Sequence, residues 1–161
     1  MKNQIKILAG LFTLCFVMTF GCNQKDNSVE LLSQVEKLVA FWNSGNFDGI
    51  EYVLSEDFEM RVSPLFEPEK GIETFKESVL NARKLYPDFE IVIDESILSD
   101  NAVSGRWTIH ATSQTGKSLI IPGMSIFHFN DGKIKDEWIS NNDLLWLNQL
   151  NYSIKPPEAE Y

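Results

Sequence analysis

The chain has 161 residues, of which 43% are hydrophobic and 12% are aromatic, which suits a single globular domain with its own core. Its 14 basic and 23 acidic residues give a net charge of −9, and we exclude nucleic acid as a partner because such a surface repels phosphate groups. Only two histidines are present, and no His-x-x-x-His or Cys-x-x-Cys spacing occurs, so we expect no metal and no cofactor.

The N-terminal segment 1–21 has the pattern of a signal peptide, with two lysines before an uncharged apolar run at 7–20. That run is shorter than the roughly 20 residues of a membrane-spanning helix. It ends at Gly21-Cys22, and the segment resembles the lipobox of bacterial lipoproteins, which carry a lipidated cysteine as their first mature residue. We therefore predict export to a bacterial cell envelope and membrane anchoring through a lipid on Cys22. Ordinary signal-peptidase cleavage nearby is the alternative.

The rest of the chain is predicted to have three parts. Residues 22–28 are polar and form a flexible tether, residues 29–152 form an α+β domain, and residues 153–161 form a tail with two prolines. Cys15 lies in the leader, so the mature domain has no disulfide and depends on its core for stability.

The first half of the domain has apolar residues at helical spacing. They predict a first helix with Ser28 as its cap, ended by Gly45, and a short second helix over 47–54. A strand is expected over 58–62, and a third helix over 72–85 carries an apolar stripe.

The second half alternates apolar and polar residues, which is typical of strands. The strands are expected at 89–94, 103–112, 119–129 and 134–141. Pro122-Gly123 predicts a bulge in the third of these, and a short helix near 144–150 closes the domain. Helices first and antiparallel strands afterwards predict one curved antiparallel sheet wrapped over the N-terminal helices.

Four segments also carry a resemblance to a known family. They are Phe41-Trp42-Asn43-Ser44-Gly45-Asn46-Phe47, Tyr86-Pro87-Asp88-Phe89, Arg106-Trp107-Thr108, and the stretch from Pro122-Gly123-Met124-Ser125 to Asp136-Glu137-Trp138. In their order and spacing they resemble the SnoaL-like branch of the nuclear transport factor two-like superfamily, whose relatives include polyketide cyclases and ketosteroid isomerases. The resemblance covers nearly all of the mature chain. It implies a cone-shaped domain with a deep small-molecule pocket between sheet and helices.

Two positions depart from the residues that the resemblance implies. The family often has an acid in the penultimate strand, where this chain has Ser125, whose hydroxyl does not release a proton near neutral pH. The polyketide cyclases tend to carry a histidine before the proline that follows the first strand, where this chain has Val62-Ser63-Pro64. We therefore favour a domain that binds a small apolar or carbonyl-containing ligand without changing it.

Two other functions stay open. One is an enzyme of the cyclase, isomerase or hydrolyase kind that transfers a proton with a rearranged acid such as Glu137 or Asp57. The other is an interaction protein with a vestigial pocket, whose outer sheet face pairs with another protein. A second copy of the chain is one such partner and would give a homodimer through that face. A carboxyl in an apolar cavity would favour the enzyme, whereas only apolar groups and hydroxyls would favour binding.

The turn at 130–133 decides which residues of the last strand face the pocket. A two-residue Asp131-Gly132 loop would point Asp136 inward and Glu137 outward, whereas a three-residue loop places Ser125 opposite Glu137. Isomerase-like relatives place the corresponding last-strand position inside, and on that resemblance we predict the three-residue loop. The predicted pocket residues are Ser125, Phe127, Glu137, Ile139 and Asn141, and burial would raise the pKa of Glu137.

The remaining polar and aromatic candidates have simpler interpretations. His110 and His128 fall in strands and are expected at surface or hydrogen-bonded positions. Trp107 and Trp138 are expected as core volume, with stacking on a ligand as the alternative. Two interpretations are equally open for Asp57, Glu59 and Arg61: they form a ligand-facing cluster, or they lie on a solvated strand face.

Overall fold

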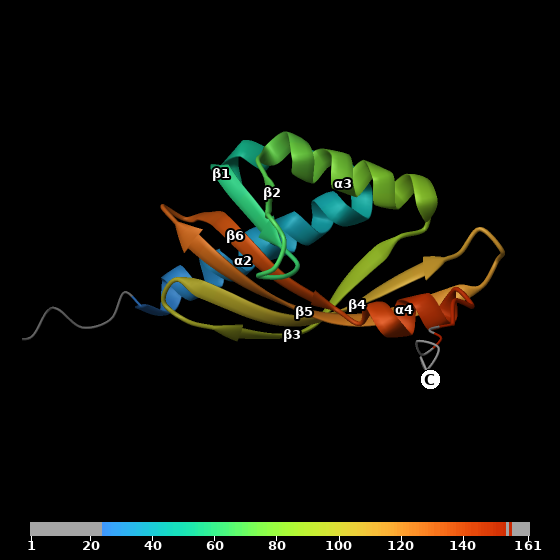
Figure 1. Ribbon diagram of the computed structural model, residues 1–161. Helices are drawn as coiled ribbons and strands as arrows, with labels where there is room; N and C mark the ends of the chain where they lie inside the picture. Colours follow the sequence, from blue (N-terminus) through green and yellow to red (C-terminus); the bar gives the residue numbers. More distant parts are fainter. Residues whose placement is uncertain (1–23, 154, 156–161) are drawn as a thin grey trace, which may run out of the picture.

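The computed structural model describes residues 24–153 and 155 (Figure 1). The helical elements are α2 (Gln24–Ser44), the 3₁₀ turn η1 (Ile50–Tyr52), α3 (Ile72–Leu85) and α4 (Asp143–Gln149). The strands are β1 (Leu54–Arg61), β2 (Glu69–Lys70), β3 (Glu90–Leu98), β4 (Ala102–Thr112), β5 (Ser118–Asn130) and β6 (Lys133–Asn141). They form one sheet in the order β2-β1-β6-β5-β4-β3.

The sheet is curved, and α2 and α3 lie over the same face of it (Figure 1). This confirms the predicted α+β class and the wrapping of a curved sheet over the N-terminal helices. The sheet is mixed rather than wholly antiparallel, because β1 and β6 are parallel neighbours. The chain leaves β1 through α3 and an antiparallel meander of three strands, and β6 then enters beside β1 in the same direction.

Helix α2 supplies one wall of the core with the predicted stripe. Leu31, Val35, Leu38 and Phe41 are buried, and Trp42 packs against both core clusters. The helix starts at Gln24, so residues 24–28, expected in a flexible tether, lie within it. No glycine or proline interrupts that stretch, and the helix extends through it.

The predicted leader, Cys22 and most of the predicted tail lie outside the described residues. In the described part of the chain, none of the helices combines the length and apolar character that crossing a membrane requires.

The second helix predicted over 47–54 is wrong. Only Ile50–Tyr52 form a helical turn, and β1 begins at Leu54, four positions before the predicted strand start at 58. Leu54 and Phe58 are both buried, and an extended chain places them in the core together with the sheet. Tertiary burial therefore overrides the local helical spacing.

Two polar side chains join the ends of α2 and α3 to the sheet. The Asn43 amide donates to the Ile91 carbonyl at 2.9 Å and accepts from the Ile91 N–H at 2.7 Å, as a neighbouring strand would. Arg83 Nη1 donates to the carbonyls of Trp42 and Phe89 at 3.2 Å and 3.1 Å. These bonds hold the C-terminal ends of both helices against the start of β3 and close one end of the interior.

The predicted bulge at Pro122-Gly123 is wrong, because β4 and β5 keep one register along their whole length. Gly123 has a different role, since it faces the indole of Trp107 across the ladder. A Cβ at Gly123 would lie 2.1 Å from a ring carbon of that indole, a distance that no side chain tolerates. The glycine therefore allows the indole to lie against β5.

Gly123→Ala should destabilise the domain by about 1–3 kcal/mol, because the new methyl displaces a large ring in a packed interior. Gly105→Ala is the matched control on β4, since the nearest atom to its Cβ would be the Glu95 carbonyl oxygen at an ordinary 3.6 Å. Urea unfolding should show a lower midpoint for Gly123→Ala and little change for Gly105→Ala. Equal losses in both variants would contradict this role of Gly123.

Candidate functional site

A cavity of about 270 Å³ lies between the helices and the concave face of the sheet. Most of its wall is apolar, and its residues come from the three α-helices and six strands of the described residues, or from the ends of these elements. The apolar part of the wall is formed by Leu38, Val39, Trp42, Met60, Val62, Ala82, Phe89, Ile91, Trp107, Ile109, Phe127, Ile139 and Trp146. Val62 and Glu69 are exposed, and they mark the opening next to α3.

The buried polar group of this cavity is the carboxyl of Glu137, which is only 4% exposed. Its Oε1 accepts a hydrogen bond from the Ser125 hydroxyl at 2.7 Å. Its Oε2 is buried and has no hydrogen-bond partner among the described residues. A buried polar oxygen without a partner is rare in native proteins, and on a cavity wall it is available to a bound molecule.

Burial raises the pKa of Glu137 to about 7, and the Ser125 hydrogen bond opposes that rise. The only other titratable side chain on the cavity wall in the described part of the chain is Glu69, at the opening, where it accepts from Ser78 Oγ at 2.8 Å. The described lining residues include no lysine, arginine or histidine, so no cation stabilises the ionised form. Both protonation states of Glu137 are therefore populated near neutral pH.

The turn that leads into β6 has two residues, so the predicted three-residue loop is wrong. Asn130 pairs with Lys133, and Asp131 and Gly132 both have positive φ, at 50° and 74°. This is the combination that a two-residue type I′ hairpin requires.

A bulge just beyond the turn nevertheless brings Glu137 to the inner face. Phe129 pairs with Ile134 but His128 pairs with Asp136, so β6 contains one extra residue, Lys135. Ile134 is fully buried, and regular alternation after it would turn Asp136 inward. With the extra residue Lys135, Asp136 instead pairs with His128 and Glu137 is the next buried side chain. The side chains beyond Lys135 change faces, and Glu137 points inward.

The structure places four of the predicted pocket residues, Phe127, Glu137, Ile139 and Asn141, in the cavity wall. Ser125 is 1% exposed and lies behind Glu137 instead of at the wall, and it pairs with Ile139 rather than with Glu137. Asp136 and Trp138 are absent from the wall.

The interpretation of Trp107 as core volume missed its place in the site. Its ring lines the cavity, and its Nε1–H donates to Ser125 Oγ at 2.9 Å. Ring, hydroxyl and carboxyl thus form one buried chain of hydrogen bonds. Strand alternation puts Trp107 on the inner face with Ile109, but the hydrogen bond depends on the register between β4 and β5, which one strand does not reveal.

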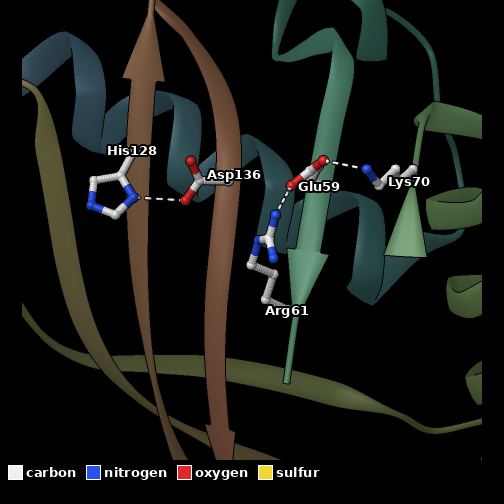
Figure 2. Close-up of polar contacts among 5 residues, drawn as sticks. All are labelled: Glu59, Arg61, Lys70, His128 and Asp136. Atoms are coloured by element: carbon white, nitrogen blue, oxygen red, sulfur yellow. Dashed lines mark hydrogen bonds and ion pairs between the residues drawn. The ribbon is translucent and has the colours of Figure 1, made fainter. Parts of the chain in front are cut away.

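Four of the other charged side chains, Glu59, Arg61, His128 and Asp136, lie on strands in front of α2, where they form polar contacts with one another or with Lys70 (Figure 2). His128 Nδ1 and Asp136 Oδ1 are 2.6 Å apart. Glu59 is paired with Arg61 and, at 2.9 Å, with Lys70. The Arg61 guanidinium lies 5.4 Å from the centre of the Trp138 ring.

This arrangement supports the solvated-face interpretation of β1 over a ligand-facing cluster, because Asp57, Glu59 and Arg61 are all absent from the cavity wall. No group of three or more His, Cys, Asp or Glu side chains within residues 24–153 and 155 has an arrangement that could hold a metal ion.

A family model described as SnoaL-like polyketide cyclase matches residues 33–150, most of the chain. The chain belongs to this family. It is similar to a candidate polyketide cyclase from Bacillus cereus, with 26% identity, a TM-score of 0.68, and coverage of 76% of this chain and 80% of the other.

More distant structures share the fold. A candidate SnoaL-like polyketide cyclase from Jannaschia sp. is 12% identical, with a TM-score of 0.71 over 83% of this chain and 100% of the other. IdmH from Streptomyces antibioticus is 15% identical, with a TM-score of 0.66 over 76% and 99%. No curated protein matches the chain.

Within the SnoaL-like framework, this chain supplies its cavity carboxyl from the last strand. Ser125 occupies the penultimate-strand position where the resemblance implies an acid, and it donates its hydrogen bond to Glu137 on the neighbouring strand. The serine therefore connects that position to the carboxyl.

The pH dependence of stability should report the burial of Glu137. The folded protein holds a proton up to about pH 7 that the unfolded chain releases near the ordinary value of 4.5, so stability is lost as the pH rises between these values. The difference corresponds to roughly 3 kcal/mol, of which most should be lost between about pH 5 and pH 8. Glu137→Gln should lack this loss when its unfolding by urea is measured at about pH 5 and at about pH 8. A constant stability difference between wild type and variant would contradict it.

Proposed function

We propose that this protein binds a small, neutral, largely apolar carbonyl compound in the cavity and transfers a proton to or from it with Glu137. The observation that carries the proposal is the unpartnered Oε2 of a buried carboxyl on the wall of an apolar cavity. It favours the cyclase or isomerase kind of enzyme over simple binding.

The protonation properties of Glu137 support this role. An efficient acid or base has a pKa near the working pH, because both its forms are then available. Burial brings the pKa of Glu137 to about 7, in that range, whereas an ordinary carboxyl is almost fully ionised there. Ser125 cannot replace it as the acid, because a hydroxyl keeps its proton near neutral pH.

The cavity also limits the class of ligand. Its volume of about 270 Å³ is close to the lower end of the roughly 300–1,000 Å³ typical of ligand pockets, which favours a small molecule. An anionic ligand would meet Glu137 and Glu69 with no cation among the described lining residues. The Asn141 amide lines the same cavity and makes no side-chain hydrogen bond within the described part of the chain, so it is available to a carbonyl oxygen.

Proton exchange in a model ketone tests the proposal. The probe is β-tetralone, a two-ring ketone with acidic C–H bonds beside its carbonyl, and NMR in heavy water follows their exchange. The wild type should accelerate exchange, with a rate that rises with pH through about 7 as Glu137 becomes the carboxylate base. Glu137→Gln should lower the rate by about 10²-fold or more, because general base catalysis contributes about that much.

Asp136→Asn is the control, since Asp136 is next to Glu137 but pairs with His128 away from the cavity wall. It should leave the exchange rate unchanged. A Glu137→Gln variant with the wild-type rate would contradict proton transfer by Glu137. Binding of β-tetralone by the wild type without any exchange would support a binding protein instead, and native mass spectrometry would then search for a co-purified ligand.

We also propose that the domain is exported and attached to a bacterial membrane through a lipid on Cys22. The support is the sequence pattern, in which an apolar run at 7–20 ends at Gly21-Cys22. Cys22→Ala should move the protein from the membrane fraction to a soluble or unprocessed form, as measured by fractionation and intact mass. Recovery of the variant in the membrane at mature length would contradict lipidation.

A further inference from the structure

The hydrogen bonds around Glu137 run in one direction only. An indole N–H is a donor and never an acceptor, so Ser125 Oγ must accept from Trp107 Nε1 over their 2.9 Å contact. The single hydroxyl proton of Ser125 is then directed to Glu137 Oε1 at 2.7 Å. All three side chains are buried, so water does not compete for these bonds.

We propose that Trp107 and Ser125 are positioning residues that fix which oxygen of Glu137 exchanges a proton with the ligand. The inference rests on the proposed proton transfer and adds its geometry. Oε1 is occupied by the directed Ser125 hydroxyl, and Oε2 is the reactive atom. The Trp107 indole acts through Ser125 and keeps its hydroxyl from rotating away from the carboxyl.

The same chain of bonds closes the protein side of the site to protons. A proton that passed from Glu137 to Ser125 would have to continue to Trp107, and the indole nitrogen cannot accept it because its lone pair is part of the aromatic ring. A proton taken from the ligand at Oε2 must therefore return to the ligand or leave through the cavity opening. Such a site suits reactions that move a proton from one atom of the ligand to another.

The position of the indole depends on Gly123. A Cβ there would overlap three ring carbons at 2.1–2.5 Å, so the indole reaches Ser125 only because this residue has no side chain. Gly123, Trp107, Ser125 and Glu137 lie on three adjacent strands, and their registers together set the bond directions.

The test is an NMR titration of Glu137, labelled at its carboxyl carbon, in wild type, Ser125→Ala, Trp107→Phe and the double variant. Ser125→Ala should raise the titration midpoint by about 0.5 to 1, because the ionised form loses a hydrogen bond. Trp107→Phe should also raise it, by a smaller amount, because the hydroxyl is no longer directed. In the Ser125→Ala background, Trp107→Phe should not raise it further.

A role for Trp107 in packing alone gives the opposite result. A smaller ring would let water approach Glu137 and lower its midpoint, equally with and without the Ser125 hydroxyl. That outcome would overturn the proposal. Trp138→Phe, which changes a ring absent from the cavity wall, is the control and should leave the Glu137 midpoint unchanged.

The titration separates this inference from the proposed function. A wild-type midpoint near 4.5 would count against Glu137 as a proton carrier at neutral pH, whereas the sign of the Trp107→Phe shift judges the positioning role by itself. In the β-tetralone assay, the pH profile of each positioning variant should move by the same amount as its NMR midpoint. A profile that stays in place while the midpoint moves would overturn the link between positioning and exchange.

Discussion

Burial of the Glu137 carboxyl without a nearby cation is the constraint on which the rest of this site depends. The charged form costs roughly 3 kcal/mol relative to water, a large part of the roughly 5–15 kcal/mol by which a typical domain is stable. This cost is what remains after the hydrogen bond from Ser125 has offset part of the desolvation. The domain core must compensate for it, and the arrangement is expected where a poised carboxyl has a use.

Two backbone features set the direction of this carboxyl, and a third gives room to the side chains that hold it. The two-residue turn at Asp131-Gly132 would by itself point Glu137 outward, and the extra residue Lys135 reverses that orientation. Gly123 gives Trp107 room to reach Ser125. Because side chains alternate along a strand, the turn and the extra residue each act as a switch between two faces rather than as a gradual adjustment.

Fold class, the third helix and the curved sheet followed from the sequence because apolar periodicity is a local property that burial preserves. The site was less predictable. The turn was predicted with the wrong length, and Glu137 points inward only because the bulge at Lys135 has the same effect on facing as the longer loop. The contact of Trp107 with Ser125 joins two neighbouring strands. Gly123 predicts a bulge in the sequence, whereas in the structure it allows the close approach of the Trp107 ring. Such features depend on cross-strand registers, which no single segment encodes.

Infrared difference spectroscopy between acidic and alkaline pH reports directly on the protonation of Glu137, because a protonated carboxyl buried away from water has its own carbonyl stretch. In the wild type, a band of this kind should disappear with a midpoint near pH 7, and it should be missing in Glu137→Gln. A band that has already disappeared near pH 4.5, or one that persists in Glu137→Gln, would contradict a poised carboxyl in this cavity.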